Sequence, residues 1–282
     1  MTSPAPDPIA ILRALGIDDT AFVEPVTGGT DTAIWRVGHA GREYALRVFR
    51  PGQQETCQRE TAAMGAAAGH LSVPAIHRHG VLGERAALLL DWCPGMTLAP
   101  HLQGASADVR KLGLAFGRMQ ARIHAIPAPD GWQPDGWIDR CGTDCQRLPE
   151  TLRRLSTDRP KLLHLDYHPM NVMTDGSEIT AVLDWANAAA GDPRADYART
   201  YTILRFADIG APGLLQDFAE GWQDGYHETS PCQADMDSFF AWAGAYMVRD
   251  LEHKIDQLAP VFTRERLAEV ARWAQQCQHR GG

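Results

Sequence analysis

Long apolar segments are absent from this sequence of 282 residues. A membrane-spanning helix needs roughly 20 consecutive apolar residues, and no stretch of the chain approaches that length. The apolar run near the N-terminus, residues 9–12, is too short for a secretory signal, and no basic segment precedes it. We therefore expect a cytoplasmic protein that does not enter a membrane.

An excess of basic residues is missing as well. The sequence has 27 Lys and Arg against 35 Asp and Glu, which gives a formal net charge of −8 at pH 7. A nucleic-acid partner is not expected, because binding to its phosphates requires a basic surface. A small phosphorylated ligand stays possible, since it needs only a local cationic pocket.

Cysteine is sparse, with six residues and no C-x-x-C pair. Cys141 and Cys145 form a C-x-x-x-C pattern on a segment without a nearby histidine. A metal or redox pair is one interpretation of this spacing. Reduced thiols in a cytosolic protein are the interpretation that we favour.

Short apolar runs separated by turn residues occupy the first third of the chain. Residues 22–26, 34–37 and 44–49 are punctuated by glycine-containing turns, which is typical of consecutive antiparallel strands. Residues 56–68 are rich in Ala, Glu and Gln and favour a helix. The continuous apolar run 86–90 predicts a buried strand.

The pattern changes after the Pro-Gly turn at residues 94–95. Beyond it, apolar residues recur at helical spacing, for example over residues 112–123. A hairpin is predicted within this helical part, over residues 172–183, because Asp175-Gly176 lies between two apolar runs. The sequence therefore predicts an α+β protein in which a small antiparallel sheet with one main helix precedes a larger, mainly helical part.

Polar residues stand at both outer ends of the predicted hairpin. The segment HLDYHPMN, residues 164–171, precedes the hairpin, and Asp184 follows it. Phosphoryl transfer requires a carboxylate that orients the acceptor hydroxyl and takes its proton, and hard oxygen ligands that hold Mg²⁺. Asp166, Asn171 and Asp184 can supply these three groups. Their arrangement predicts a phosphotransferase.

The pattern H-x-D-x-x-x-x-N, then a hairpin, then Asp resembles the catalytic and metal loops of the protein-kinase-like superfamily. With LDWANAAAGDPRADYA at residues 183–198, the chain is similar to the aminoglycoside phosphotransferase family. The resemblance covers about residues 26–200. It implies a bilobal kinase-like fold that uses ATP, or GTP as an alternative, with Mg²⁺ to phosphorylate a small-molecule hydroxyl.

The resemblance also implies roles for individual residues. Asp166 is the expected catalytic base or hydroxyl-positioning group. Asn171 and Asp184 are the expected Mg²⁺ ligands. We interpret His164 as a structural residue that holds its loop by hydrogen bonds.

The implied nucleotide site lies in the first third of the chain. The backbone of Gly28, Gly29 and Thr30 is expected to approach the phosphates, because glycine allows close approach. Arg47 stands where protein kinases carry a lysine, and its retained positive charge suits phosphate. Glu60, on the following helix, is the implied carboxylate partner of Arg47.

A hinge is expected between the two lobes. Backbone groups of Asp91 and Cys93 would bind adenine there. The resulting organisation is a nucleotide-binding lobe over residues 1–91, a hinge over 92–97, and a catalytic and acceptor-binding lobe over 98–282.

Acidic residues are frequent after the predicted hairpin. We interpret Asp192 and Asp196 as residues that cap a helix and anchor a loop. The others are Asp224, Glu228, Asp235, Asp237, Asp250, Glu252 and Asp256. They form either a groove for a cationic acceptor or ordinary solvated helix faces.

Two P-D-G-W segments end at Trp132 and Trp137. One hypothesis is that Trp137 lines the acceptor pocket, where its ring would stack on a sugar. The alternative is that such a residue fixes its loop to the core.

The predicted function is phosphorylation of an aminoglycoside or a similar amino or sugar compound. A choline-, homoserine- or fructosamine-kinase-like metabolic activity is the nearest alternative, since one fold supports many acceptors. A non-catalytic nucleotide-binding pseudokinase is the third possibility. Arg47 is the one feature in its favour, and the complete set of Asp166, Asn171 and Asp184 counts against it.

Overall fold

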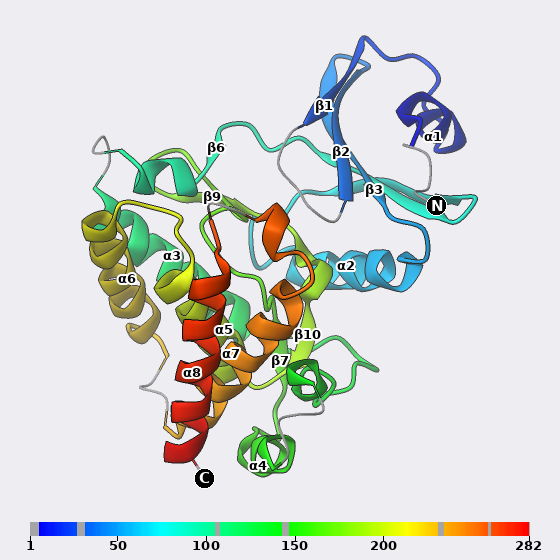
Figure 1. Ribbon diagram of the computed structural model, residues 1–282. Helices are drawn as coiled ribbons and strands as arrows, with labels where there is room; N and C mark the ends of the chain where they lie inside the picture. Colours follow the sequence, from blue (N-terminus) through cyan, green and yellow to red (C-terminus); the bar gives the residue numbers. More distant parts are fainter. Residues whose placement is uncertain are drawn as a thin grey trace.

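The computed structural model describes residues 6–26, 32–104, 108–142, 147–230, 234–258 and 261–281. An antiparallel sheet with two helices comes first, and a mainly helical part follows (Figure 1). The predicted α+β class is therefore confirmed. None of the helices in these residues combines the length and apolarity needed to cross a bilayer.

The five-stranded sheet has the order β1-β2-β3-β5-β4, and every neighbouring pair is antiparallel. Its strands are β1 (Phe22–Val26), β2 (Thr32–His39), β3 (Arg42–Phe49), β4 (Ile76–Leu82) and β5 (Arg85–Asp91). The strands expected from the apolar runs are thus all present. The added edge strand, β4, pairs with β5 through a tight turn at Gly83.

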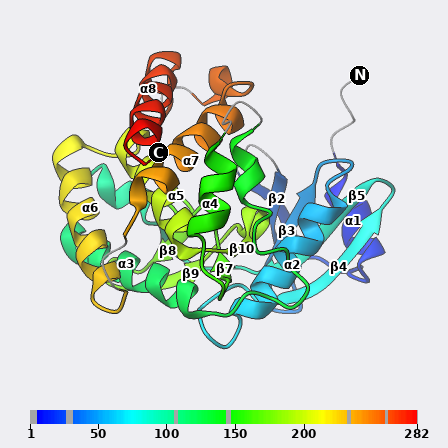
Figure 2. The same ribbon diagram turned by 90° about the horizontal axis from the view of Figure 1, so that it is seen from below.

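The alternation of side chains along β3 decides where Arg47 points. Leu46 and Val48 are buried in one cluster with helix α1 (Pro8–Ala14), which the sequence analysis did not predict. Arg47 lies between them and therefore faces the opposite side of the sheet. Helix α2 (Gln54–Ala67) covers that side and lies along the sheet in the second view (Figure 2).

The helical part contains two small sheets as well. Its elements are β6 (Met96–Thr97), η1 (Ala99–Leu102), α3 (Val109–Ala125), η2 (Ile138–Cys141), α4 (Leu148–Leu155), β7 (Lys161–Leu163), β8 (Val172–Thr174), β9 (Ile179–Val182), η4 (Trp185–Asn187), β10 (Ala189–Gly191), α5 (Pro193–Phe206), α6 (Pro212–His227), α7 (Met236–Leu251), η5 (Ile255–Gln257) and α8 (Arg264–Arg280). The predicted hairpin exists as β8 and β9. The β7–β10 pair was not predicted. Since β6 pairs with β8, the end of the expected hinge is tied to the helical part.

Helices α3 and α6 pack very closely, and glycine makes this contact possible. A Cβ atom at Gly113 or Gly117 would collide with backbone oxygens of Phe218 and Trp222, respectively. A Cβ atom at Gly221 or Gly225 of α6 would likewise collide with backbone oxygens of α3. Both pairs have the spacing i, i+4, which places the glycines on one face of each helix. The matching order of contacts shows that the two helices run parallel.

Candidate active site

The segment that contains Asp166 is a loop between β7 and β8. Its far end is joined to the end of the hairpin, because the Leu183 amide donates to the backbone oxygen of Asn171 at 2.8 Å. Asp184 follows Leu183 directly. The fold therefore brings the residue before the hairpin and the residue after it to one place.

Asp196 holds the beginning of this loop. Its carboxylate is fully buried and accepts hydrogen bonds from the amides of His164 (2.9 Å) and Leu165 (2.7 Å). His124 Nε2 contacts the same carboxylate at 3.0 Å. Burial opposes ionisation, but these hydrogen bonds and the histidines hold the pKa of Asp196 below its ordinary value. The predicted anchoring role is confirmed.

The predicted capping role holds for one of the two acids only. Asp192 is the N-cap of α5, and its side chain accepts from the amide of Arg194. Asp196 lies inside the first turn of α5, so its interpretation as a capping residue was wrong. The helix begins four residues earlier than the apolar pattern suggested, because Pro193 is compatible with a first helical position.

His164 is fully buried and links the loop to the far end of the hairpin. Its Nε2 atom lies 2.9 Å from the Leu183 oxygen, and its Nδ1 atom accepts from the Asp166 amide at 3.3 Å. Burial lowers the pKa of His164, which fits a neutral ring with one donor and one acceptor nitrogen. The prediction of a structural histidine is confirmed.

Asp166 lies among cationic and amide groups. Its Oδ1 atom is 3.6 Å from His168 Nε2, and the Asn171 side-chain nitrogen donates to its backbone oxygen at 3.0 Å. Burial by itself raises the pKa of Asp166, but His168, Arg199 and His164 outweigh burial and hold it well below its usual range. An ionised carboxylate is therefore presented at neutral pH.

Asn171 and Asp184 carry the oxygen atoms that can hold a divalent cation. Because the side-chain nitrogen of Asn171 binds Asp166, its amide oxygen is the end that can ligate a metal. Asp184 has a left-handed backbone with φ 60°, as does Leu165 in the loop that contains Asp166. Non-glycine residues in this region often mark functional sites. No cluster of three His, Cys, Asp or Glu side chains suited to a metal occurs among the described residues.

Arg47 connects the sheet to these carboxylates. Its Nη2 atom lies 2.7 Å from Asp184 Oδ1, and its Nη1 atom lies 3.1 Å from Glu60 Oε1. The expected Arg47–Glu60 ion pair is thus present. Arg47 and Glu60 are both buried. Burial raises the pKa of Glu60 to about 7, although Arg47 opposes the rise.

Three of the expected nucleotide contacts, Gly28, Gly29 and Thr30, lie outside the described residues. Asp91 ends strand β5, and its amide already donates to the Ala75 oxygen at 3.0 Å. Its carbonyl oxygen is therefore the group that adenine could use. Cys93 is half-buried just beyond the strand. The adenine contacts at both positions stay predictions.

The acidic residues of the C-terminal helices are mostly engaged with arginines at the surface. Asp224 pairs with Arg110, and Glu228 pairs with Arg118. Asp237 and Asp256 likewise pair with Arg280 and Arg264, respectively. These ion pairs favour solvated helix faces over an acidic groove.

The hypothesis that Trp137 lines an acceptor pocket was wrong. The side chain is fully buried, with its ring stacked on Phe239 at 5.9 Å and edge-on to Trp242 at 4.8 Å. Its indole nitrogen donates to the Pro134 oxygen. Trp137 therefore fixes its loop to the core. Burial of an indole depends on long-range packing, so the local sequence could not decide between the two interpretations.

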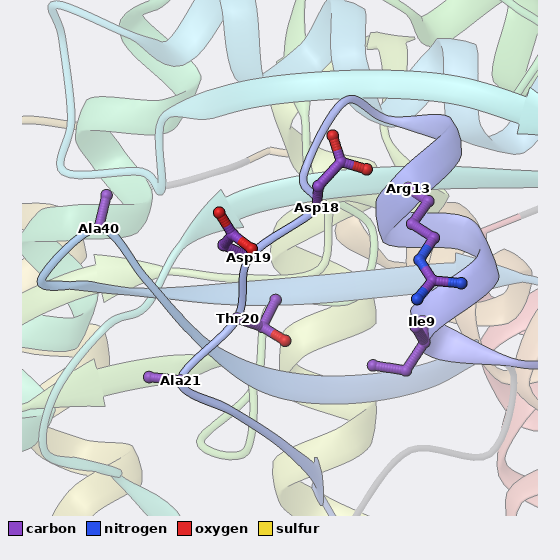
Figure 3. A pocket seen from close by; sticks show the side chains of 7 residues that line it. All are labelled: Ile9, Arg13, Asp18, Asp19, Thr20, Ala21 and Ala40. Carbon is purple, nitrogen blue, oxygen red and sulfur yellow. The ribbon is translucent and has the colours of Figure 1, made fainter.

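A surface hollow of about 560 Å³ lies in the first part of the molecule, between helix α1 and the β2–β3 turn (Figure 3). Arg13, Asp18 and Asp19 are among its lining residues. No residue of the loop around Asp166 borders it. This hollow is therefore separate from the candidate active site.

Comparison with known proteins agrees with this arrangement. The family described as the phosphotransferase enzyme family matches residues 23–232, which is most of the chain. The chain belongs to this family. It is therefore a phosphotransferase enzyme, and its family is the one that the HLDYHPMN segment indicated. A search of curated proteins found no match.

Solved structures of phosphotransferases share the fold across nearly the whole chain. Aminoglycoside phosphotransferase APH(4)-Ia has a TM-score of 0.70 at 15% identity, with 97% of each chain covered. A putative aminoglycoside phosphotransferase from Ralstonia eutropha JMP134 has a TM-score of 0.67 at 17% identity, covering 96% of this chain and 95% of that one. A putative fructosamine-3-kinase from Haemophilus somnus 129PT has a TM-score of 0.64 at 15% identity, covering 95% and 96%. These likenesses establish the kinase-like fold of the phosphotransferase.

Proposed function

We propose that this phosphotransferase moves the γ-phosphate of ATP, with Mg²⁺, to a hydroxyl group of a small molecule. The observation that carries the proposal is the convergence of Asp166, Asn171 and Asp184 beside Arg47. The convergence rests on the Leu183–Asn171 backbone hydrogen bond and on the Arg47–Asp184 contact. These are the groups that positioning and charge neutralisation require in phosphoryl transfer.

Asp166 has the role of orienting the acceptor hydroxyl and taking its proton. The lowered pKa of Asp166 keeps its carboxylate ionised at neutral pH. Only the ionised carboxylate can accept a proton from the hydroxyl. The buried contacts of His164 and Asp196 fix the backbone on the N-terminal side of Asp166. A fixed loop limits the motion of the carboxylate relative to the acceptor.

The oxygen donors present suit magnesium. Mg²⁺ prefers oxygen ligands and is usually bound by one or two carboxylates together with substrate phosphates. The amide oxygen of Asn171 and the carboxylate of Asp184 would hold it, and the bound ion would neutralise phosphate charge. Arg47, which now contacts Asp184, is placed to bind phosphate by its guanidinium.

Nucleotide binding is supported by structures that share the fold. A thermostable mutant of APH(4)-Ia is a ternary complex with AMP-PNP and hygromycin B, at a TM-score of 0.69 and 15% identity. We propose that Gly28, Gly29 and Thr30 approach the phosphates, and that the backbone of Asp91 and Cys93 binds adenine. GTP is the alternative donor. Competition between the two nucleotides for a fluorescent ATP analogue would decide the preference.

The acceptor is proposed to be a hydroxylated small molecule of the sugar type. APH(4)-Ia and the fructosamine-3-kinase share the fold, and both names indicate carbohydrate-derived acceptors. Aminoglycosides are therefore one candidate class. Choline- or homoserine-kinase-like acceptors are the metabolic alternative.

The decisive experiment follows ADP release in a panel of hydroxylated acceptors with Mg-ATP. With an accepted substrate, we expect Asp166→Asn to lower kcat by at least about a thousandfold, because the proton acceptor is lost. Mg-ATP binding by calorimetry should stay unchanged, since Asp166 is assigned no nucleotide contact. Asp217→Asn, at an exposed position on α6, is the matched control. Turnover by Asp166→Asn at the wild-type rate would refute the assigned role.

A further inference from the structure

Two arginines from different elements lie over one aromatic ring, and a third arginine is within electrostatic reach of them. Tyr246 of α7 is buried, with the guanidinium carbon of Arg199 (α5) 4.4 Å from its ring centroid. The guanidinium carbon of Arg140 (η2) lies 5.9 Å from the same centroid. Arg59 of α2 is within electrostatic reach of both Arg140 and Tyr246. We call Arg59, Arg140 and Arg199 the arginine cluster.

Arg199 is the most buried member, with 3% of its surface exposed. Its Nη2 atom makes a long contact with Asp250 at 3.4 Å, and Asp250 is shared with Lys254. The Nε and Nη1 atoms of Arg199 are buried and have no hydrogen-bond partner. Leaving such donors without acceptors costs free energy, so an acceptor supplied by a ligand would stabilise them.

Arg140 and Arg59 are half-buried and extend the cluster outward. Arg140 donates to the Asn187 oxygen at 2.6 Å, which places it beside the segment that follows Asp184. Burial lowers the pKa of Arg59, and the charge of Arg140 lowers it further. Like charges that approach while partly desolvated repel each other. An anion between them would remove this cost.

The cluster lies close to the reacting centre. The Tyr246 hydroxyl donates to Asn187 Oδ1 at 3.5 Å, and Asn187 is the third residue after Asp184. Thr200, the neighbour of Arg199 on α5, donates to the oxygen of Tyr167, the residue after Asp166, at 2.9 Å. Helix α2, which carries Arg59, lies beside the segment between β9 and β10 in both views (Figures 1 and 2). Among the described residues, the acids that interact with the arginine cluster by contact or charge are Glu55, Asp166 and Asp250. Most other acids of the C-terminal helices are paired elsewhere, as described above.

From these observations we infer that the arginine cluster is an anion subsite of the acceptor pocket, so that the phosphotransferase acts on a hydroxylated molecule carrying a carboxylate or phosphate group. This inference rests on the proposed function, because it names the acceptor class of the same site. It opposes a polycationic acceptor, which three guanidinium groups would repel. Arginine suits both anions because its planar fork binds their oxygens in pairs.

The test compares compounds that share a sugar or polyol skeleton and carry an anionic, a neutral or a cationic group. One set is gluconate, sorbitol and glucamine, and the other is glucose 6-phosphate, glucose and glucosamine. Each compound is measured twice: for phosphate transfer from Mg-ATP, and for thermal stabilisation of the protein with Mg-AMP-PNP. We expect an anionic member to exceed its neutral counterpart by about tenfold to a hundredfold in kcat/KM, as a charge-assisted hydrogen bond would give. The better of gluconate and glucose 6-phosphate identifies the preferred anion.

Variants then assign the preference to the arginine cluster. Arg140→Gln and Arg59→Gln change half-buried positions and should bring the anionic-to-neutral ratio close to one, whereas Arg140→Lys should keep part of it. Arg110→Gln is the matched control, because this exposed arginine pairs with Glu220 and Asp224 on the outer surface. The ratio should be unchanged in that variant.

The outcomes separate the two proposals. A preference for the amino members, or equal results for anionic and neutral members in both measurements, would overturn the anion subsite. If Arg140→Gln and Arg59→Gln lower kcat/KM equally for the anionic, neutral and amino compounds, the arginines have a purely structural role. That result would also overturn the anion subsite. If no compound is phosphorylated and Asp166→Asn releases ADP like the wild type, the proposed function fails instead. In that case, stronger thermal stabilisation by the anionic than by the neutral compounds would still support the anion subsite, and equal stabilisation would overturn it.

Discussion

Asp196 illustrates how one buried side chain fixes a loop that carries chemistry. Its carboxylate accepts from two successive backbone amides and contacts His124. Thr200, one turn later on α5, donates to the Tyr167 oxygen at 2.9 Å. The loop around Asp166 is therefore attached to α5 on both sides of this residue. Loss of these contacts should therefore change the position of the Asp166 carboxylate and lower the stability of the folded protein.

We expect Asp196→Asn to lower the free energy of unfolding by about 2–4 kcal/mol, because an amide cannot accept all of these hydrogen bonds. Urea denaturation measures the loss, and kcat should fall as the loop loosens. Asp158→Asn, at an exposed position, is the control. Because the pKa of Asp196 is lowered by folding, its contribution is fully present above the unfolded pKa of about 4 and is lost as pH falls below it. The difference in the free energy of unfolding between the variant and the wild type should therefore become smaller in acid. A difference that does not change with pH would contradict the role given to the ionised Asp196 carboxylate.

Other residues of the proposed site carried little signal in the sequence. Arg199 and Tyr246 belong to ordinary helical stretches, and Arg140 belongs to a short turn. Each looks like a surface or core residue until the helices are packed. His168 was visible within HLDYHPMN, but its 3.6 Å approach to Asp166 depends on the conformation of the loop.

At the scale of elements, α3 and α6 form a closely packed parallel pair in the helical part. The glycines at i, i+4 positions on both helices let the backbones approach until no Cβ fits. Gln120 of α3 continues this contact by accepting from the Trp222 indole at 2.8 Å and donating to Thr200 of α5 at 2.9 Å. This helix pair is thus connected to α5, which holds the loop around Asp166.

We expect Gly117→Ala to destabilise the protein by about 1–3 kcal/mol, because an added methyl group would separate two packed backbones. Gly65→Ala is the matched control. Gly65 also lies inside a helix, but a Cβ there would meet nothing within 4 Å. That change should stabilise the protein by about 0.5–1 kcal/mol. Thermal or urea unfolding compares the two, and equal effects would argue against close packing at Gly117.

At the scale of the whole molecule, Arg47 joins the two parts of the fold. It belongs to the sheet, contacts Glu60 on α2, and reaches Asp184 in the helical part, 137 residues away in the sequence. Helix α2 also packs against the short η4 turn that follows Asp184. The proposed nucleotide site therefore depends on how both parts are held together.

We expect Arg47→Gln to destabilise the protein by about 3 kcal/mol, since it leaves Glu60 buried without its cationic partner. Without Arg47, nothing opposes the effect of burial, and the pKa of Glu60 rises further in the variant. The wild type stops losing stability once Glu60 ionises near pH 7, whereas the variant continues to lose it, so the difference between them should grow as pH rises above about 7. The double change Arg47→Gln with Glu60→Gln should restore much of the stability. Mg-ATP binding should stay weak in both variants, as measured by calorimetry. Full recovery of binding in the double variant would refute the role of Arg47 at phosphate.

The sequence by itself determined the elements and the chemistry that depend on local patterns. Short apolar runs between turn residues specified the strands of the sheet. The Asp-Gly segment specified the hairpin, although its strands are joined by a four-residue loop, residues 175–178. The fixed spacing of Asp166, Asn171 and Asp184 identified the reaction class, since a loop and a hairpin bring such residues together over a short stretch of chain.

Only the tertiary structure decided what depends on packing between distant segments. It buried Trp137 in the core, directed Asp196 to two backbone amides and paired most acids of the C-terminal helices with arginines. It also placed Arg140 and Arg199 over the ring of Tyr246, with Arg59 within electrostatic reach, although the three arginines come from separate elements. The charge environment and burial of these residues depend on which helices and loops pack against each other. Patterns among neighbouring residues in the sequence do not reveal that packing.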